Sequence, residues 1–100
     1  MAQRVWITEF ASLASAEGAG TLQVARLPAV TRQLLDVTSG VQTSAAFNLS
    51  TNFIRVICEV QCAVRGDGVA ATANDLLIPA FGAEYFGITP GSTISVIAAP

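Results

Sequence analysis

Residues 53–65 read Phe-Ile-Arg-Val-Ile-Cys-Glu-Val-Gln-Cys-Ala-Val-Arg, and this stretch decides the fold class of the chain. Every even-numbered position in it is apolar, whereas the positions between them are mainly polar. Alternation with a period of two is typical of an antiparallel strand that is buried on one face. The pattern therefore predicts one long half-buried strand, or two strands bent about residues 59–61. The stretch ends at Gly66-Asp67-Gly68, a composition typical of a tight turn.

Six further short stretches are rich in β-branched and aromatic residues and are bounded by turn-forming residues, which is typical of strands. They are residues 5–10, 30–37, 41–47, 76–79, 84–88 and 93–98. The loop Thr38-Ser39-Gly40 predicts a hairpin between the second and third of them, and Pro79 indicates an edge strand or a strand end. The apolar residues at the end of the chain predict a last strand tied into a sheet or docked on a neighbouring chain.

The fold class predicted from these stretches is all-β. We expect residues 1–100 to form a single antiparallel domain, either a β-sandwich or a small jelly-roll-like barrel, of about seven or eight short strands. Residues 11–28 consist largely of small residues without a sustained period. They predict a long N-terminal loop or arm, with a short helix over 11–17 as an alternative.

The composition points to a protein that binds another protein. Hydrophobic residues make up 52% of the chain and charged residues 12%, about half the charged share of a typical soluble domain. Some apolar surface is therefore expected to face a partner chain. The net charge is −2, with five scattered arginines, so we expect no nucleic acid as a partner. No window of 18 residues is free of charges and turn formers, and the first residues lack the apolar core of a signal peptide, so we expect no membrane partner either.

Residues that could carry catalysis are scarce. The chain has no histidine and no lysine, and no Gly-x-Ser-x-Gly motif, so the usual general bases and activated nucleophiles are missing. The acidic residues, Glu9 among them, show no telling spacing and are interpreted as solvated or salt-bridged surface groups. We therefore predict that the protein is not an enzyme, and that it has no catalytic residues and no cofactor.

The two cysteines, Cys58 and Cys62, lie in the alternating stretch. In an extended strand they would be roughly 13 Å apart, too far for a disulfide unless a turn separates them. Buried free thiols are therefore predicted, and two thiols without histidine make a poor metal site. The triplet Arg65-Gly66-Asp67 matches a cell-adhesion tripeptide but is interpreted as part of the turn.

Aromatic residues near the chain ends suggest an interaction surface. Phe10 and Phe86 are expected to fill the core. Trp6 has a better claim as an interface anchor, because tryptophan and arginine are enriched at interface hot spots and Arg4 is close by. The candidate residues for protein contact are Arg4, Trp6, Leu13, Leu22, Val24 and Tyr85.

Several sequence blocks resemble a group of small structural proteins of tailed bacteriophages. The blocks are Trp6-Ile7-Thr8-Glu9-Phe10, Ser44-Ala45-Ala46-Phe47-Asn48, Phe53-Ile54-Arg55-Val56, Leu77-Ile78-Pro79-Ala80, Glu84-Tyr85-Phe86-Gly87-Ile88 and a terminal Gly-x-x-Ile-Ser-Val-Ile. They cover about half of the chain and leave residues 11–36 unmatched.

The resemblance implies a virion protein of the phage head, a capsid decoration or cement protein. Such proteins look like compact β-sandwiches or barrels that assemble as homotrimers and bridge subunits of the major capsid protein. This implies a location on the capsid exterior after synthesis in the bacterial host cytoplasm. A tail, head–tail joining or fibre-associated module that recognises a surface receptor is the alternative. The group has no motif that assigns a role to a single residue.

Overall fold

The structure, a computed structural model, describes residues 3–16 and 20–100, and the side chains of these residues apart from 14–16 and 20–23. The described part of the chain contains no helix, and therefore no helical segment that could span a membrane. It forms ten strands: β1 (Arg4–Phe10), β2 (Leu13–Ala16), β3 (Gly20–Ala25), β4 (Thr31–Asp36), β5 (Gln42–Thr43), β6 (Phe53–Cys58), β7 (Cys62–Arg65), β8 (Leu76–Ile78), β9 (Ala83–Gly87) and β10 (Ser95–Ala98).

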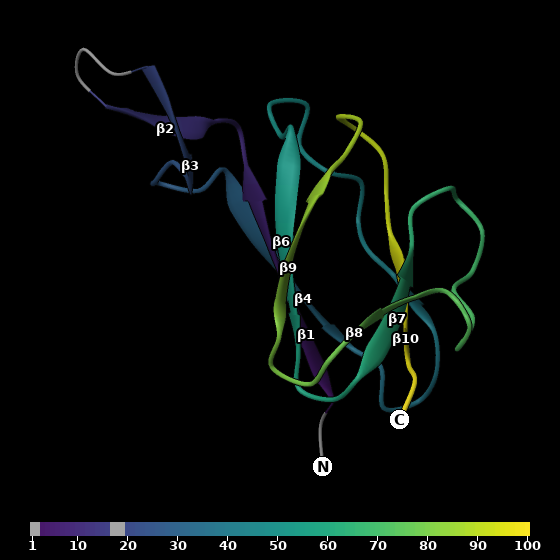
Figure 1. Cartoon of the computed structure of the whole chain (residues 1–100). Coiled ribbons are helices and arrows are strands. Elements are labelled where there is room, and N and C mark those ends of the chain that lie inside the picture. The colour runs from purple at the N-terminus through teal and green to yellow at the C-terminus, as the bar shows by residue number, and fades with distance from the viewer. Residues whose placement is uncertain (1–2, 17–19) are drawn as a thin grey trace.

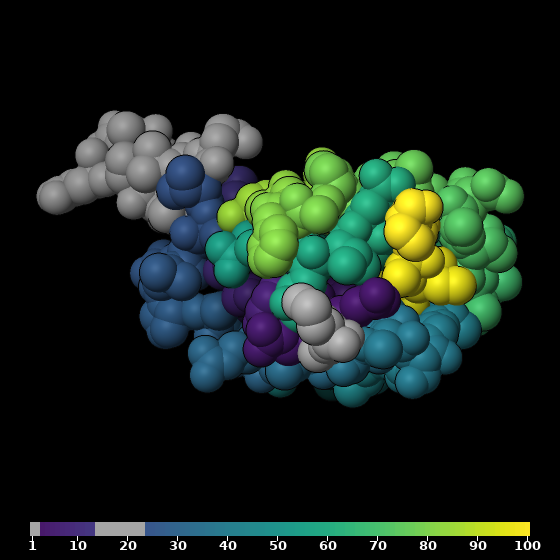
Figure 2. Space-filling view, turned by 90° about the horizontal axis from the view of Figure 1, so that it is seen from below, coloured from purple at the N-terminus to yellow at the C-terminus, as the bar shows by residue number. Residues whose placement is uncertain are grey.

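Two antiparallel four-stranded sheets pack face to face as a small β-sandwich (Figure 1). The first sheet has the order β4-β1-β6-β9 and the second has the order β5-β10-β7-β8. The space-filling view shows the start of the chain lying between the segments that pair with it (Figure 2), as expected for a central strand. The fold class predicted from the sequence is therefore confirmed, and of its two architectures the structure has the sandwich.

Side-chain alternation builds the core between the sheets. In β1 the odd positions point inward, so that Val5 and Ile7 are fully buried. In β6 the even positions do so, among them Ile54 and Val56. The second sheet supplies the opposing layer from β7, β8 and β10. The core cluster consists of Val5, Ile7, Val37, Phe47, Ile54, Val56, Cys58, Cys62, Val64, Ile78, Ile94 and Val96.

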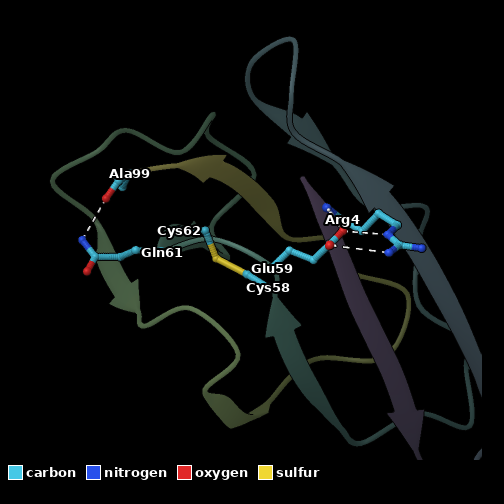
Figure 3. Close-up of a disulfide and its surroundings, with 6 residues drawn as sticks. All are labelled: Arg4, Cys58, Glu59, Gln61, Cys62 and Ala99. Atoms are coloured by element: carbon cyan, nitrogen blue, oxygen red, sulfur yellow. Dashed lines mark hydrogen bonds and ion pairs between the residues drawn. A yellow bond between two sulfur atoms is a disulfide. The ribbon is translucent and has the colours of Figure 1, made fainter. Parts of the chain in front are cut away.

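The stretch 53–65 is two strands rather than one. The chain bends at residues 59–61 and passes from the first sheet to the second, so the even positions face the same core from opposite sides. Cys58 and Cys62 consequently face each other and form a disulfide, with Cα atoms 6.6 Å apart (Figure 3). The predicted free thiols are wrong, because the turn between the cysteines brings together two residues that an extended strand would separate.

Within the predicted loop or arm at residues 11–28, the described residues 13–16 and 20–25 are paired strands, and 13–16 are therefore not part of the alternative helix over 11–17, whose last residue lies outside the described residues. Strands β2 and β3 form an antiparallel hairpin with a register shift between Leu13 and Ser15. In Figure 1 this hairpin extends away from the end of the first sheet, beyond the sandwich. Small residues without alternation suit a ribbon that is not packed between two layers, which explains why no strand pattern was visible.

Of four further predictions about strands and turns, one was wrong, one was correct only in part, and two were confirmed. Thr38-Ser39-Gly40 is no hairpin loop, because β4 and β5 belong to different sheets. Within 41–47 only Gln42–Thr43 pairs as a strand, while Phe47 is buried in the core from a segment outside any strand. Strand β8 is an edge strand, as Pro79 indicated, and the end of the chain is held in the second sheet as β10.

Candidate functional site

The outer face of the first sheet carries two parallel rows of side chains. Register places Leu34, Trp6 and Ile57 side by side across β4, β1 and β6. Two residues along each strand, Arg32, Thr8 and Arg55 form the next row, and Tyr85 of β9 continues it. The outer face of a sandwich is normally polar, whereas one of these rows is apolar.

A loop turns this face into a groove. Residues 26–30 connect β3 to β4, and Leu27, Pro28 and Ala29 stand beside the two rows, with a cis peptide bond before the proline. Together with the side chains of the two rows on β4, β1 and β6 they line an open groove with a volume of about 1360 Å³. Leu27 is 76% exposed and Leu34 60% exposed. A concave apolar surface of this kind is typical of a site that binds another molecule.

Two arginines supply the charge of the groove. Neither Arg32 nor Arg55 has a carboxylate within 4.0 Å in the described part of the chain. The Nε atom of Arg55 is buried and has no hydrogen-bond partner there, and its terminal nitrogen donates only a long bond of 3.5 Å to Thr8. The groove therefore presents positive charge beside apolar side chains.

Arg4 is held at one end of the same face by Glu59. The Nε of Arg4 donates to Oε1 of Glu59 at 2.6 Å, and the backbone N–H of Arg4 donates to the same oxygen at 2.9 Å (Figure 3). The guanidinium carbon lies 5.3 Å from the centre of the Trp6 ring, within cation–π distance. The hydrogen bond from Arg4 lowers the pKa of Glu59 below its ordinary value. Glu59 thus positions Arg4 beside Trp6.

An aromatic cluster lies at the other end of the face. The rings of Phe10 and Phe53 stack with centroids 5.2 Å apart, and Tyr85 lies 6.2 Å from Phe53 and 6.4 Å from Phe10. Phe10 is buried as predicted, but under this cluster on the outer face rather than between the sheets. Phe86, on the opposite side of β9, is partly buried against the core, as expected. Tyr85 remains 53% exposed.

The six predicted interface residues fall into two groups. Arg4, Trp6 and Tyr85 share the outer face of the first sheet. Leu13 and Val24 lie in the hairpin β2–β3, where Val24 is 55% exposed. Leu22 lies in β3, outside the residues whose side chains the structure describes.

Sequence reasoning missed most of the groove. Arg32, Leu34, Arg55 and Ile57 were not among the predicted residues, and neither was the loop wall at Leu27 to Ala29. A signal was present in β1, where Trp6, Thr8 and Phe10 alternate with inward residues and make its outward face nearly as apolar as its inward face. An outward face of that kind indicates that the sheet is covered by something else.

Glu9 was expected at the surface but is buried within the sandwich, 1% exposed. Its Oε1 accepts hydrogen bonds from Thr51 Oγ1 at 2.8 Å and from the Asn48 N–H at 2.9 Å. Its Oε2 accepts from Gln33 Nε2 at 3.0 Å. The carboxylate therefore fastens the loop 44–52 to the first sheet, and burial is tolerated because every bond is made.

Another group of polar side chains lies at the end of β7. Arg65 pairs with Asp67 at 2.8 Å and with Asp75 at 3.8 Å, so the Arg-Gly-Asp triplet closes its own turn. Among the described residues no group of three or more histidine, cysteine or acidic side chains could hold a metal ion.

Comparison with known proteins gives no relative: no protein-family model, curated protein or solved structure matches the chain.

Proposed function

We propose that the protein is a bacteriophage virion structural protein, a decoration or cement protein that stabilises the head by binding between major capsid subunits. The observation that carries the proposal is the outer face of the first sheet, an apolar groove with two arginines that no described element covers. The sequence blocks that resemble phage head proteins supply the identity of the partner, the major capsid protein. In this proposal the protein acts by binding and is not an enzyme.

Self-association is part of the proposal. A homotrimer would present three copies of the groove and three hairpins to a symmetric shell, and repeated modest contacts give high avidity. The hairpin β2–β3 is the candidate for contact between subunits, because it extends beyond the sandwich and exposes Val24.

The proposed location is the capsid exterior, after synthesis in the bacterial cytoplasm. Disulfides form in oxidising surroundings and are rare in the cytosol. The Cys58–Cys62 bond would therefore close after the particle leaves the cell, when the protein has to hold the shell without further support from the host.

A fibre-associated or tail module is the second candidate function. The observation that favours it is the exposed ring of Tyr85 beside Arg55 on the outer face of the first sheet, because exposed aromatic rings beside polar groups are suited to stacking on sugars. Binding to a glycan array, together with no affinity for capsids, would favour this alternative over the cement function.

The test is co-sedimentation of the purified protein with capsids that lack it, with the mass of the free protein measured by light scattering. Saturable binding at a fixed ratio to the major capsid protein, from a free trimer, is the expected result. Absence of binding at any concentration would overturn the cement proposal.

Two variants sharpen this test. Leu34→Ser removes an exposed leucine from the groove and should weaken binding, whereas Leu49→Ser removes an even more exposed leucine outside the groove and should not. For the hairpin, residues 13–25 can be replaced by Asn-Gly, because the Arg26 N–H donates to the Ser12 carbonyl at 3.1 Å and a two-residue turn fits there. The replacement is preferred to a deletion of residues 1–28, because that deletion would also remove β1 from the middle of the first sheet.

A further inference from the structure

The groove holds positive charge that the chain does not neutralise. Three carboxylates on or near the first sheet are engaged elsewhere: Glu59 with Arg4, Glu9 inside the sandwich, and Asp36 with two backbone N–H groups at the end of β4. The fourth, Glu84 of β9, is exposed, in register with Val56, and forms no ion pair with Arg32 or Arg55. Within the described residues, Arg32 and Arg55 have no carboxylate within 4.0 Å. The imbalance is local to the groove, whose lining contains Arg32 and Arg55 and no acidic residue, although the net charge of the chain is −2.

Arg55 is the better defined of the two. Its Nε–H is shielded from solvent and makes no hydrogen bond with the described residues. Buried donors without a partner are rare because they lose the hydrogen bonds that water would give them. The Arg55 guanidinium therefore keeps hydrogen-bonding capacity that the described residues do not use, and its terminal nitrogens, which make only the 3.5 Å bond to Thr8, are the atoms that an acceptor entering the groove would meet.

The surroundings indicate the chemistry of that acceptor. A guanidinium matches a carboxylate through two parallel hydrogen bonds. The strands β4 and β6 flank β1 and are about 10 Å apart, so the long side chains of Arg32 and Arg55 can converge on one segment. Beside them Leu34, Trp6 and Ile57 form an apolar row suited to aliphatic side chains.

We propose that the groove binds an extended segment of a partner protein in which an Asp or Glu side chain lies beside aliphatic residues. The carboxylate pairs with Arg55 and Arg32, and the aliphatic side chains lie on the row of Leu34, Trp6 and Ile57. This assignment deepens the proposed function, because it names the chemistry of the capsid segment that the groove would meet. A nucleic acid fits less well, since two arginines in an acidic protein do not track a phosphate backbone.

The experiment is a selection that does not depend on capsids. The full-length protein is immobilised and a displayed library of random 12-residue peptides is selected against it. We expect the enriched peptides to contain Asp or Glu next to aliphatic residues, more often than the input library does. The affinity of two such peptides, made synthetically, is then measured for the wild type, for Arg32→Gln, for Arg55→Gln and for Arg65→Gln.

Loss of a charge-assisted pair should weaken binding about tenfold or more in Arg55→Gln and Arg32→Gln. Arg65→Gln removes the same charge from the second sheet and should bind as the wild type does. Replacement of the peptide carboxylate by the matching amide should weaken binding to the wild type and change little in Arg55→Gln. Circular dichroism and thermal unfolding of each variant establish that the fold is intact.

Other outcomes overturn the assignment. No enrichment, enrichment without acidic residues, or equal affinity in all variants would show that the groove does not read a carboxylate. Displacement of the peptides by a single-stranded oligonucleotide of 20 nucleotides would assign the groove to nucleic acid. Self-association that Arg55→Gln abolishes would assign it to a second copy of this chain.

Capsid co-sedimentation in parallel separates the two proposals. Selection of acidic peptides by a protein that does not bind capsids would overturn the cement function alone. Capsid binding that survives both groove substitutions, with no acidic peptides selected, would overturn the groove assignment alone.

Discussion

Cys58 and Cys62 are joined across the interior of the sandwich, although each belongs to a strand of a different sheet and only three residues separate them. The disulfide holds the bend through which the chain leaves the first sheet and enters the second. Around it, the backbone N–H of Glu59 donates to the Arg4 carbonyl at 2.9 Å, and Gln61 binds the carbonyl of Ala99 at 2.8 Å (Figure 3). The bend at residues 59–61 therefore joins the two sheets and is also hydrogen-bonded to Arg4 near the start of the chain and to Ala99 near its end.

Reduction of this disulfide should destabilise the protein without unfolding it at room temperature. A loop this short constrains the unfolded chain modestly, and the expected loss is about 2 kcal/mol. Urea unfolding with and without a reductant measures it. The double variant Cys58→Ala/Cys62→Ala should be destabilised and indifferent to the reductant, and an equal midpoint for oxidised and reduced wild type would contradict the prediction.

The buried carboxylate of Glu9 should be among the most sensitive positions for stability. Glu9→Ala leaves the Asn48 N–H and the Thr51 hydroxyl without an acceptor, which should cost about 2–4 kcal/mol. Glu9→Gln should lower the free energy of unfolding by less, because the amide keeps one acceptor oxygen for Asn48 and Thr51. Some loss remains, because its NH₂ group then faces the NH₂ group of Gln33. Urea midpoints should rank wild type, glutamine and alanine in that order, and any other ranking would argue against the network.

Acid should weaken the fold partly through Glu59. The hydrogen bond from Arg4 lowers the folded-state pKa of Glu59 below its ordinary value of 4.5. A group with a lower pKa in the folded state stabilises the protein above its unfolded-state value, and this contribution is lost as pH falls through the folded-state pKa. We expect the melting temperature to decline below about pH 4.5 and to decline less in Glu59→Gln. The exposed Glu84→Gln variant is the control, and identical acid limbs for all three proteins would refute the role of Glu59.

Arg55→Met should separate stability from binding. Methionine keeps the length of the side chain over the sheet and removes the buried donor that lacks a partner, so stability should be unchanged or higher. Binding of an acidic peptide should be lost. Thermal unfolding and peptide titration on the same sample test this, and a marked loss of stability would mean that Arg55 serves the fold instead.

Phe81 is held in a conformation that phenylalanine disfavours. Its φ is +58° and its side chain is 67% exposed, in the turn 79–82 between β8 and β9. Asparagine tolerates this region better, so Phe81→Asn should raise the free energy of unfolding by about 0.5–1 kcal/mol. The neighbouring Gly82→Ala should do the opposite, because its Cβ would lie 2.7 Å from a side-chain atom of Pro79. Stabilisation by both substitutions would contradict the geometry of the turn.

Much of the sandwich could be predicted because alternation is a local property. A strand turns successive side chains to opposite faces whatever it pairs with. The apolar even-numbered positions of residues 53–65 could therefore be assigned to the core from the sequence alone. Prediction failed where the signal depends on distant partners. The hairpin β2–β3 has no alternation because it is not packed between two layers, and the loop at 38–40 looks like a hairpin until its flanking strands enter different sheets.

The candidate site was predicted only in part for the same reason. Trp6 and Tyr85 stood out by residue type, and Arg4 by its proximity to Trp6. Arg32, Arg55 and the loop wall at Leu27 come together through pairing between strands more than 20 residues apart. No local pattern marks an arginine that will lack a partner after folding.

The sequence by itself determined that this is an all-β protein with too little charge to cover its surface and with one face of each main strand buried. Those properties depend on residue type and on a period of two, which a chain carries before it folds. Only the tertiary structure decided that Cys58 meets Cys62, that Glu9 lies inside, and that two arginines share an apolar groove. Each of these is a relationship across strands, and burial and charge compensation exist only once the sheets have packed.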